Sequence, residues 1–250
     1  MIRYYPPRFL FRRYEILRRV KRGTSFLEIG PGNLYLAVDL LGYFKRGTLI
    51  DYNLQVKDRY DNLEEPLKEH LDLMIGEFFT SVTQLQLKYD CVVACEVMEH
   101  VENDSNFLSI AYDLLNDQGQ LVLSVPSRMK YWSKHDEIVG HFRRYEKQRI
   151  INILSDQGFQ NICVVSYGFP FLNILRLLRI LLAWFQYDSR VKWSKDRQIQ
   201  QSGFIQVNFL TSLLGVICNK HTVYPLNLLS CLFNGRDLSD GYVITAEKMS

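Results

Sequence analysis

The stretch SFLEIGPGN, residues 25–33, decides the fold of this chain. Its first five residues have the apolar pattern of a β-strand, the turn that follows contains Gly30 and Gly32, and a helical pattern begins at Leu34. Doubly wound α/β sheets form a nucleoside-sized pocket at such a turn, at the carboxyl end of the first strand. A Cβ at either glycine would hold a ligand away from the backbone. Glu28 stands just before the turn and suits a ligand with a cationic end better than a pyrophosphate.

Short apolar runs and helical patterns alternate along the rest of the chain. We predict further strands at 48–52, 71–75, 90–95, 120–125, 162–167 and 242–246, and helices at 7–21 and 146–157. This alternation predicts βαβ units and therefore an α/β fold with a doubly wound, mainly parallel, seven-stranded sheet. The predicted organisation is a basic N-terminal helix (1–22), a ligand-binding domain (23–167 and 241–250) and a helical insertion before the last strand (168–240).

The composition is that of an ordinary globular protein, with 47% apolar and 23% charged residues. The five cysteines form no CxxC pair, and the five histidines have no metal-ligand spacing with them, so we predict free thiols and no metal site. The first residues are rich in Arg and Tyr and lack the apolar core of a secretory signal, which predicts a cytoplasmic protein.

The net charge of +3 conceals an uneven distribution. Residues 1–22 carry eight basic side chains and one acidic side chain, and residues 168–240 carry eight basic and four acidic ones. The remaining residues are therefore acidic, with a balance of −8. Two basic segments on an acidic body favour an anionic surface or substrate as partner. The alternative is a pair of helices whose arginines only face solvent.

Three further stretches extend the pattern that the glycine turn begins. They are YDCVVACEVMEHVEN (89–103), LLNDQGQLVLSVPS (114–127) and GHFRRYEKQRIINILSDQGF (140–159), and an acidic residue, Asp51, ends the second strand. Together with the turn, they resemble class I S-adenosylmethionine-dependent methyltransferases, above all the small-molecule enzymes of the quinone pathways. The resemblance covers about residues 24–167 and the last strand. It implies a Rossmann-like methyltransferase fold and S-adenosyl-L-methionine as cofactor, with S-adenosyl-L-homocysteine as product.

The resemblance also implies a role for each matching position. The glycine turn would hold the methionine part of the cofactor, and Asp51 would accept hydrogen bonds from both ribose hydroxyls. Adenine would lie near Glu77 and Phe78, where the family usually has Asp in place of Glu77. Cys95 and Glu96 would line the sulfonium end. The predicted cofactor-binding residues are thus Glu28, Gly30, Gly32, Asp51, Tyr52, Glu77, Phe78, Cys95 and Glu96.

The loop after the fifth strand would open over the cofactor and carries the candidate groups for the methyl acceptor. His135 and His141 are candidate bases, because imidazole titrates near neutral pH. We predict in-line methyl transfer to a small-molecule or lipid-like acceptor, with oxygen favoured as the acceptor atom. The predicted substrate-binding residues are His100, Asp136, Arg143, Arg144 and Tyr145. The alternative is that HFRRY (141–145) only braces the loop and caps the next helix, and that His100 packs inside its own helix.

The insertion contains the run FPFLNILRLLRILLAWFQY (169–187), followed by a second apolar run at 204–218. The polar members of the first run form one narrow helical stripe: Asn173, Arg176, Arg179, Ala183 and Gln186. Two arginines in mid-helix would be costly at the centre of a bilayer, so a membrane span is disfavoured. Two alternatives stay open. The insertion packs on itself, on the core or on a second subunit of a homodimer, or it rests on an anionic membrane surface, at the inner face, and admits a lipid-like acceptor.

Three other functions are weaker fits to the sequence. A nicotinamide-dependent oxidoreductase would need a third glycine where Tyr35 stands, and Glu28 would repel its pyrophosphate. A non-catalytic binding or assembly module would have no physical need for the intact set of Glu28, Gly30, Gly32 and Asp51. Methylation of nucleic acid is disfavoured, because CEVM (95–98) stands where an Asn-Pro-Pro-Tyr motif would be expected.

Overall fold

A computed structural model describes residues 5–85, 87–190 and 218–249 of the chain. The chain divides into two compact units. Unit 1 comprises Met1–Arg18, Pro126–Lys147 and Val165–Val243. Unit 2 comprises Arg19–Val125, Gln148–Val164 and Ile244–Ser250. Each unit is therefore assembled from segments that are distant in the sequence.

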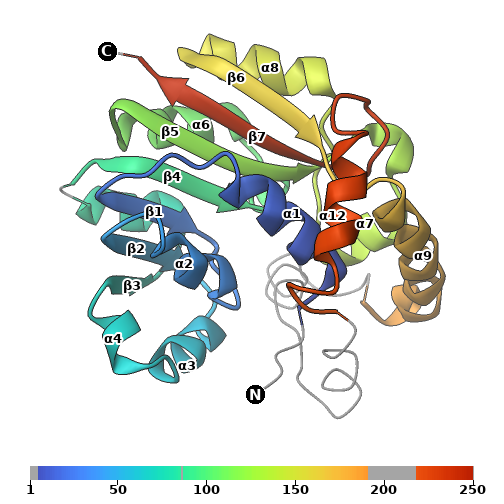
Figure 1. Cartoon of the computed structure of the whole chain (residues 1–250), viewed down its shortest axis with the longest axis horizontal. Coiled ribbons are helices and arrows are strands. Elements are labelled where there is room, and N and C mark those ends of the chain that lie inside the picture. Colours follow the sequence, from blue (N-terminus) through green and yellow to red (C-terminus); the bar gives the residue numbers. More distant parts are fainter. Residues whose placement is uncertain (1–4, 86, 191–217, 250) are drawn as a thin grey trace. The chain divides into compact units, whose positions relative to one another are not determined.

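The strands form one seven-stranded sheet in the order β3-β2-β1-β4-β5-β7-β6. The pairs β1–β2, β1–β4, β2–β3 and β4–β5 are parallel, and the arrow of β7 runs opposite to that of β5 (Figure 1). The predicted doubly wound, mainly parallel, seven-stranded sheet is confirmed. The strands are β1 (Ser25–Ile29), β2 (Arg46–Asp51), β3 (Leu71–Ile75), β4 (Tyr89–Cys95), β5 (Leu115–Pro126), β6 (Phe159–Ser166) and β7 (Gly241–Lys248).

The helices that flank the sheet in unit 2 bury its central strands on both faces (Figure 1). Every residue of β1 is buried, as expected for a parallel strand between two helical layers. These helices are α2 (Tyr35–Leu40), α3 (Gln55–Asp61), α4 (Glu65–Lys68), α5 (Phe78–Ser81), α6 (Asp104–Asp113) and α8 (Lys147–Asp156), with the short 3-10 helices η1 (Val82–Gln84) and η2 (Met98–His100).

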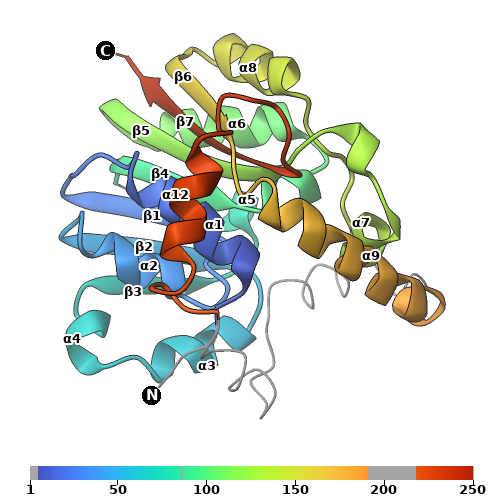
Figure 2. The same cartoon turned by 45° about the vertical axis from the view of Figure 1, so that its right-hand side comes forward.

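The described residues of unit 1 form helices, connecting loops and the ends of β5, β6 and β7. The helices among these residues are α1 (Pro7–Leu17), η3 (Met129–Tyr131), α7 (Lys134–Val139), α9 (Phe171–Arg190) and α12 (Tyr224–Cys231). Helices α7 and α9 pack against each other and lie side by side in both views (Figures 1 and 2). Helix α9 matches the helical pattern of 169–187, whereas 204–217 of the second apolar run lies outside the described residues. In the parts of the chain that the structure describes, no helix is both long and apolar enough to cross a bilayer.

The bounds of several predicted elements differ from the observed ones, and two differ by four or five residues at one end. The N-terminal helix ends at Leu17 rather than near residue 21, because the backbone of Arg19 and Lys21 is bound by the side-chain amide of Gln120. Strand β5 begins at Leu115, five residues before its predicted start. Residues 116–119 form an irregularity inside the β4–β5 pairing, with Gln118 in the left-handed region at a φ of 62°.

Candidate active site

The turn after β1 has the backbone conformation that glycine permits. Gly30 and Gly32 have φ angles of 68° and 53°, and the N–H of Gly30 donates to the carbonyl oxygen of Ile50 at 2.9 Å. A Cβ on Gly30 would lie 2.7 Å from Cγ2 of Val97, well inside van der Waals contact. Both the left-handed backbone and the lack of space therefore require glycine at position 30.

Two buried carboxylates flank this turn. Glu28 belongs to β1 and has only 2% of its surface exposed. Asp51 ends β2, and its two carboxylate oxygens accept hydrogen bonds from the N–H groups of Gly32 (3.3 Å) and Asn53 (2.9 Å). Burial raises the pKa of Asp51, and the backbone N–H donors only partly offset this effect. Asp51 thus joins the ends of the first two strands and carries a carboxylate that an added hydrogen-bond donor would stabilise.

The next two strands bring the remaining cofactor candidates to the same edge. After β3, Glu77 caps α5 by accepting from the N–H of Thr80 at 3.1 Å, and Phe78 is buried with its ring 5.0 Å from that of Phe107. After β4, Glu96 accepts from the hydroxyl of Ser124 at 3.0 Å. The parallel registers align the carboxyl ends of β1 to β4. All predicted cofactor-binding residues lie at this edge: Glu28, Gly30, Gly32, Asp51, Tyr52, Glu77, Phe78, Cys95 and Glu96.

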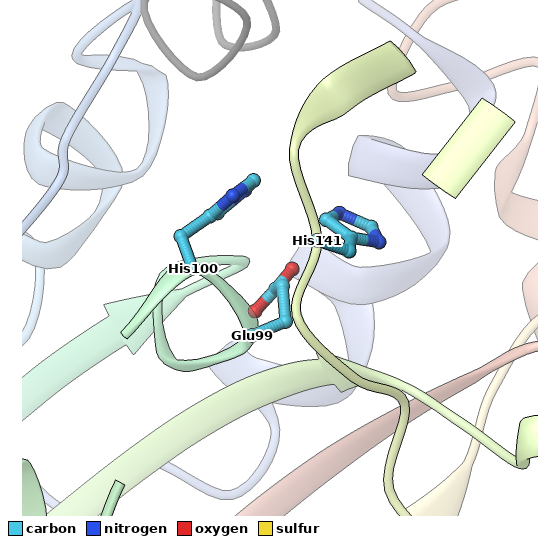
Figure 3. A group of neighbouring side chains, drawn as sticks. All are labelled: Glu99, His100 and His141. Carbon is cyan, nitrogen blue, oxygen red and sulfur yellow. The ribbon is translucent and has the colours of Figure 1, made fainter. Parts of the chain in front are cut away.

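The short helix η2 follows the same edge of β4. Figure 3 shows its residues Glu99 and His100 next to each other in the chain, and Glu99 is fully buried. His141, also drawn there, is a residue of unit 1. Glu99 and His100 are residue types that bind metals in other proteins. The absence of a metal site, and the contact of His100 with the acceptor, stay predictions.

In unit 1, the fully buried carboxylate of Asp136 organises the segment that contains the predicted bases. Its Oδ2 accepts from the N–H of Ser133 at 2.9 Å and from the Ser133 hydroxyl at 3.0 Å. The first of these bonds, with the Ser133 side chain accepting from the backbone N–H of Asp136, forms a capping box at the start of α7. Its Oδ1 accepts from Nε of Arg144 at 2.7 Å and lies 2.9 Å from Nδ1 of His141. Both oxygens of Asp136 are therefore engaged by this one segment.

These contacts keep Asp136 ionised. Burial alone would raise the pKa of Asp136, but the hydrogen bonds from His141 and Arg144, with the charge of Arg144, outweigh burial and hold that pKa well below its usual range. An ionised Asp136 can only accept a hydrogen bond, so Nδ1 of His141 carries the proton and donates it. In the neutral imidazole the lone pair is then on Nε2. This is the arrangement that makes a histidine an oriented base.

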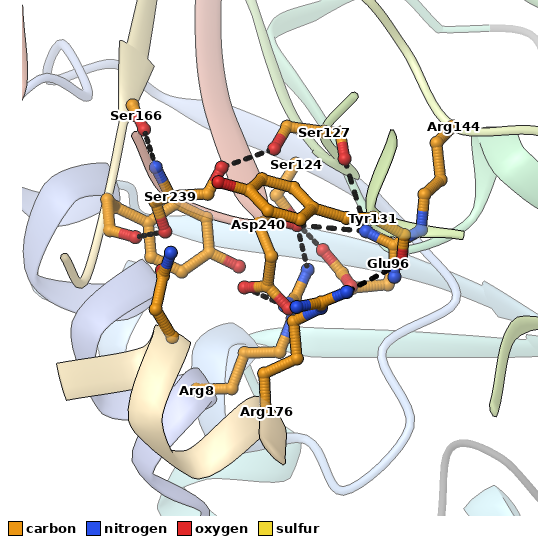
Figure 4. A network of polar contacts seen from close by, with 12 residues as sticks. Arg8, Glu96, Ser124, Ser127, Tyr131, Arg144, Ser166, Arg176, Ser239 and Asp240 are labelled. Atoms are coloured by element: carbon orange, nitrogen blue, oxygen red, sulfur yellow. Dashed lines mark hydrogen bonds and ion pairs between the residues drawn. The ribbon is translucent and has the colours of Figure 1, made fainter. Parts of the chain in front are cut away.

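The side chain of Arg144 extends the network. Its NH1 group donates to the carbonyl oxygen of Ser127 at 3.1 Å, and the Ser127 hydroxyl donates to Ser239 at 2.6 Å. Asp240 in turn pairs with Arg8 of α1 at 2.9 Å. Figure 4 shows these residues linked through successive polar contacts. Segments around residues 8, 127, 144 and 240 are thereby held together within unit 1.

The other predicted acceptor residues have different surroundings. His135, on α7, and Arg143 are half-buried. Tyr145 is fully buried, and its backbone N–H and carbonyl bind the backbone of Pro126 and Arg128 at 3.0 and 2.8 Å. These contacts, like those of Asp136 and Arg144, favour a supporting role. Contact of any of these residues with the acceptor stays a prediction.

Sequence reasoning missed five members of the network: Ser133, Ser127, Ser239, Arg8 and Asp240. The pattern Ser133-x-x-Asp136 is a capping-box signal that could have placed the start of α7. The Arg8–Asp240 pair joins residues 232 positions apart, and no local pattern announces such a contact.

Comparisons with known proteins show the family of the chain. The family model described as "Methyltransferase domain" matches residues 2–164. The mitochondrial ubiquinone biosynthesis O-methyltransferase of Schizosaccharomyces pombe is 30% identical over 109 residues, which is 42% of this chain and 39% of that protein. A Mycobacterium tuberculosis protein described as a "Probable S-adenosylmethionine-dependent methyltransferase" is 25% identical over 173 residues, which is 64% of this chain and 60% of that protein. The chain spans less than two thirds of the length of either relative.

Solved structures show the same fold. The structure of Haemonchus contortus phosphoethanolamine N-methyltransferase 2 with S-adenosyl-L-methionine has a TM-score of 0.55 and 16% identity, and the match covers 95% of this chain and 52% of that one. At this identity the likeness shows the fold alone. The family model matches well over half of the chain, and the chain therefore belongs to the methyltransferase-domain family.

Proposed function

We propose that this chain transfers the methyl group of S-adenosyl-L-methionine to an oxygen atom of a small-molecule or lipid-like acceptor. The observation that carries the proposal is the grouping of Glu28, the glycine turn and Asp51 at one edge of the sheet. We assign cofactor binding to the domain of residues 23–167 and 241–250. The ubiquinone biosynthesis O-methyltransferase relative supports oxygen as the acceptor atom.

The cofactor side of the site follows from charge and space. The cofactor supplies a methyl group already activated on a sulfonium sulfur. Gly30 and Gly32 would let it approach the backbone, and Asp51 would accept hydrogen bonds from its ribose hydroxyls. The buried carboxylate of Glu28 complements the cationic end of the methionine part. The protein's main task is then to hold the acceptor in line with the methyl carbon, which contributes about 7–11 kcal/mol in favourable cases.

His141 is the proposed general base. His141 would accept the proton of the acceptor hydroxyl at Nε2; the cofactor, when bound, would supply the methyl group and leave as S-adenosyl-L-homocysteine. Asp136 fixes the proton of His141 on Nδ1 and stabilises the imidazolium that results. A positioned base contributes about 10²–10⁴-fold. His135 is the second candidate, because it is also half-buried and lies on α7.

Calorimetric titration with S-adenosylhomocysteine tests the cofactor assignment. We expect binding by the wild-type chain, loss of at least about tenfold in affinity for Asp51→Ala, and no change for Asp58→Ala, an exposed aspartate of the same unit. NAD serves as the comparison ligand. Tight NAD binding without S-adenosylhomocysteine binding would overturn the proposal. A screen of hydroxylated acceptors, with and without an alkyl chain, tests methyl transfer directly by release of S-adenosylhomocysteine.

A further inference from the structure

Helix α9 presents an exposed apolar stripe. Ile174, Leu177, Leu181 and Trp184 recur at intervals of three, four and three residues, so they lie on one helical face. Between 56% and 64% of the surface of each side chain is exposed. Soluble proteins expose single apolar side chains commonly, but a contiguous row of four large ones on one helix marks a binding surface. We call these four residues the α9 stripe.

The polar side of the same helix faces unit 1 itself. Nδ2 of Asn173 donates to the carbonyl oxygen of Leu238 at 2.9 Å, and Arg176 donates to the carbonyl oxygen of Tyr131 at 3.4 Å. The guanidinium carbon of Arg176 also lies 4.6 Å from the centre of the Tyr131 ring. These contacts fix the rotation of α9 about its axis. Asn173 and Arg176 are therefore held by unit 1, whereas the four apolar residues of the α9 stripe are exposed.

Charge indicates what the stripe meets. Unit 1 contains 19 Lys and Arg and 8 Asp and Glu, a balance of +11, whereas unit 2 has a balance of −8. One cationic side chain contacts the stripe, since Nζ of Lys134 lies 3.9 Å from the centre of the Trp184 ring, and Lys130 is exposed on η3 of the same unit. An apolar row with a Trp at its end and a lysine in contact with it is the composition of an interfacial helix.

We infer that α9 docks unit 1 on an anionic lipid surface, with the α9 stripe entering the boundary between headgroups and acyl chains. Lys130 and Lys134 would then contact the lipid phosphates. A second copy of the chain is the other occupant that an apolar stripe can have. Pairing two copies of unit 1 would bring together two net charges of +11. The resulting repulsion favours an anionic lipid surface over a second copy as the occupant. The inference concerns attachment and stands apart from the proposed function.

Vesicle co-sedimentation of the whole chain tests the inference. The probes are phosphatidylcholine vesicles with roughly 30% phosphatidylglycerol, and vesicles of phosphatidylcholine alone. We expect binding to the anionic vesicles in about 0.05 M salt, much weaker binding in about 0.5 M salt, and much weaker binding to the neutral vesicles. Leu177→Glu/Leu181→Glu should reduce the affinity by at least about tenfold, and Lys130→Glu/Lys134→Glu should reduce it by a similar factor on anionic vesicles only.

Matched controls come from unit 2. Leu54 has 71% of its surface exposed and Lys57 is exposed, so Leu54→Glu and Lys57→Glu introduce the same chemistry away from the stripe. Both should bind vesicles within about twofold of the wild type. Two results would overturn the inference. One is equal vesicle binding by the Leu177→Glu/Leu181→Glu variant. The other is failure of the wild type to bind anionic vesicles while light scattering shows a dimer that these two substitutions dissociate, because a second copy would then be the occupant.

Discussion

Nδ1 of His141 lies 2.9 Å from Oδ1 of Asp136, a carboxylate with no exposed surface. The same oxygen accepts from Arg144, so a cation and an imidazole share one acceptor. The cation holds Asp136 in its ionised form, and the ionised oxygen holds the imidazole in one tautomer. Arg144 thus influences which nitrogen of His141 carries the proton without contacting His141, because it acts through Asp136.

The first prediction is kinetic. On a hydroxyl acceptor, His141→Gln should lower kcat by about 10²–10⁴-fold, because the acceptor proton loses its base. Asp136→Asn should lower kcat in the same direction, since its amide can donate to Nδ1 and reverse the tautomer. KM for S-adenosylmethionine should stay unchanged in both variants. Initial rates at saturating cofactor measure this.

His135→Gln is the matched comparison, because it removes a half-buried imidazole from α7, the helix that carries Asp136. Its kcat should stay within about twofold of the wild type if His141 is the base. If kcat fell strongly for His135→Gln and stayed normal for His141→Gln, His135 would be the base that accepts the acceptor's proton.

A second prediction concerns stability. Because the folded pKa of Asp136 lies below the unfolded value of about 3.9, the ionised carboxylate stabilises the fold above that pH and loses this effect as the pH falls toward the folded pKa. Asp136→Asn should therefore lower the free energy of unfolding by about 3–5 kcal/mol at neutral pH. The difference in the free energy of unfolding between the wild type and Asp136→Asn should become smaller below about pH 4. Urea unfolding curves of both proteins measure it, and a gap that is independent of pH would contradict the assigned ionisation.

The sequence was sufficient for the sheet but not for this network. Strands β1 and β3 have their predicted bounds, since each is a short apolar run with turn residues after it. The contacts of Asp136 depend on how the chain reverses after α7. Gly140 ends that helix in the left-handed conformation, with a φ of 81°, and returns His141 to Asp136. The spacing of residues in the sequence does not predict that the chain after Gly140 brings His141 back to Asp136.

The rotation of α9 was open for a similar reason. The polar stripe of 169–187 was visible in the sequence, but its direction depends on partners that lie 45 and 65 residues away, Tyr131 and Leu238. Patterns of hydrophobicity predict that a helix has two faces. Which face turns inward is decided by the hydrogen-bond acceptors of the neighbouring segments.

A third prediction follows from the raised pKa of Asp51. The ribose hydroxyls donate to the ionised carboxylate, so protonation of Asp51 competes with cofactor binding. The affinity for S-adenosylhomocysteine should fall as the pH is lowered through this pKa, by up to about tenfold per pH unit below it. Asp51→Asn should bind weakly and without this dependence. Calorimetry over a pH series that starts near the ordinary aspartate pKa of about 3.9 measures both, and a parallel dependence in the variant would place the titrating group elsewhere.

The last prediction separates two effects at Gly30. Gly30→Ala places a Cβ 2.7 Å from Cγ2 of Val97 and also forces an alanine to a φ of 68°. Val97→Ala relieves the contact but not the backbone strain, which costs about 1–2 kcal/mol. The double variant should therefore regain part of the S-adenosylhomocysteine affinity that Gly30→Ala loses. If the double variant regained the full affinity, glycine would be required at position 30 only because a Cβ contacts Val97. If it regained none, glycine would be required for the backbone conformation and for the approach of the ligand. Calorimetry on Val97→Ala by itself is the control.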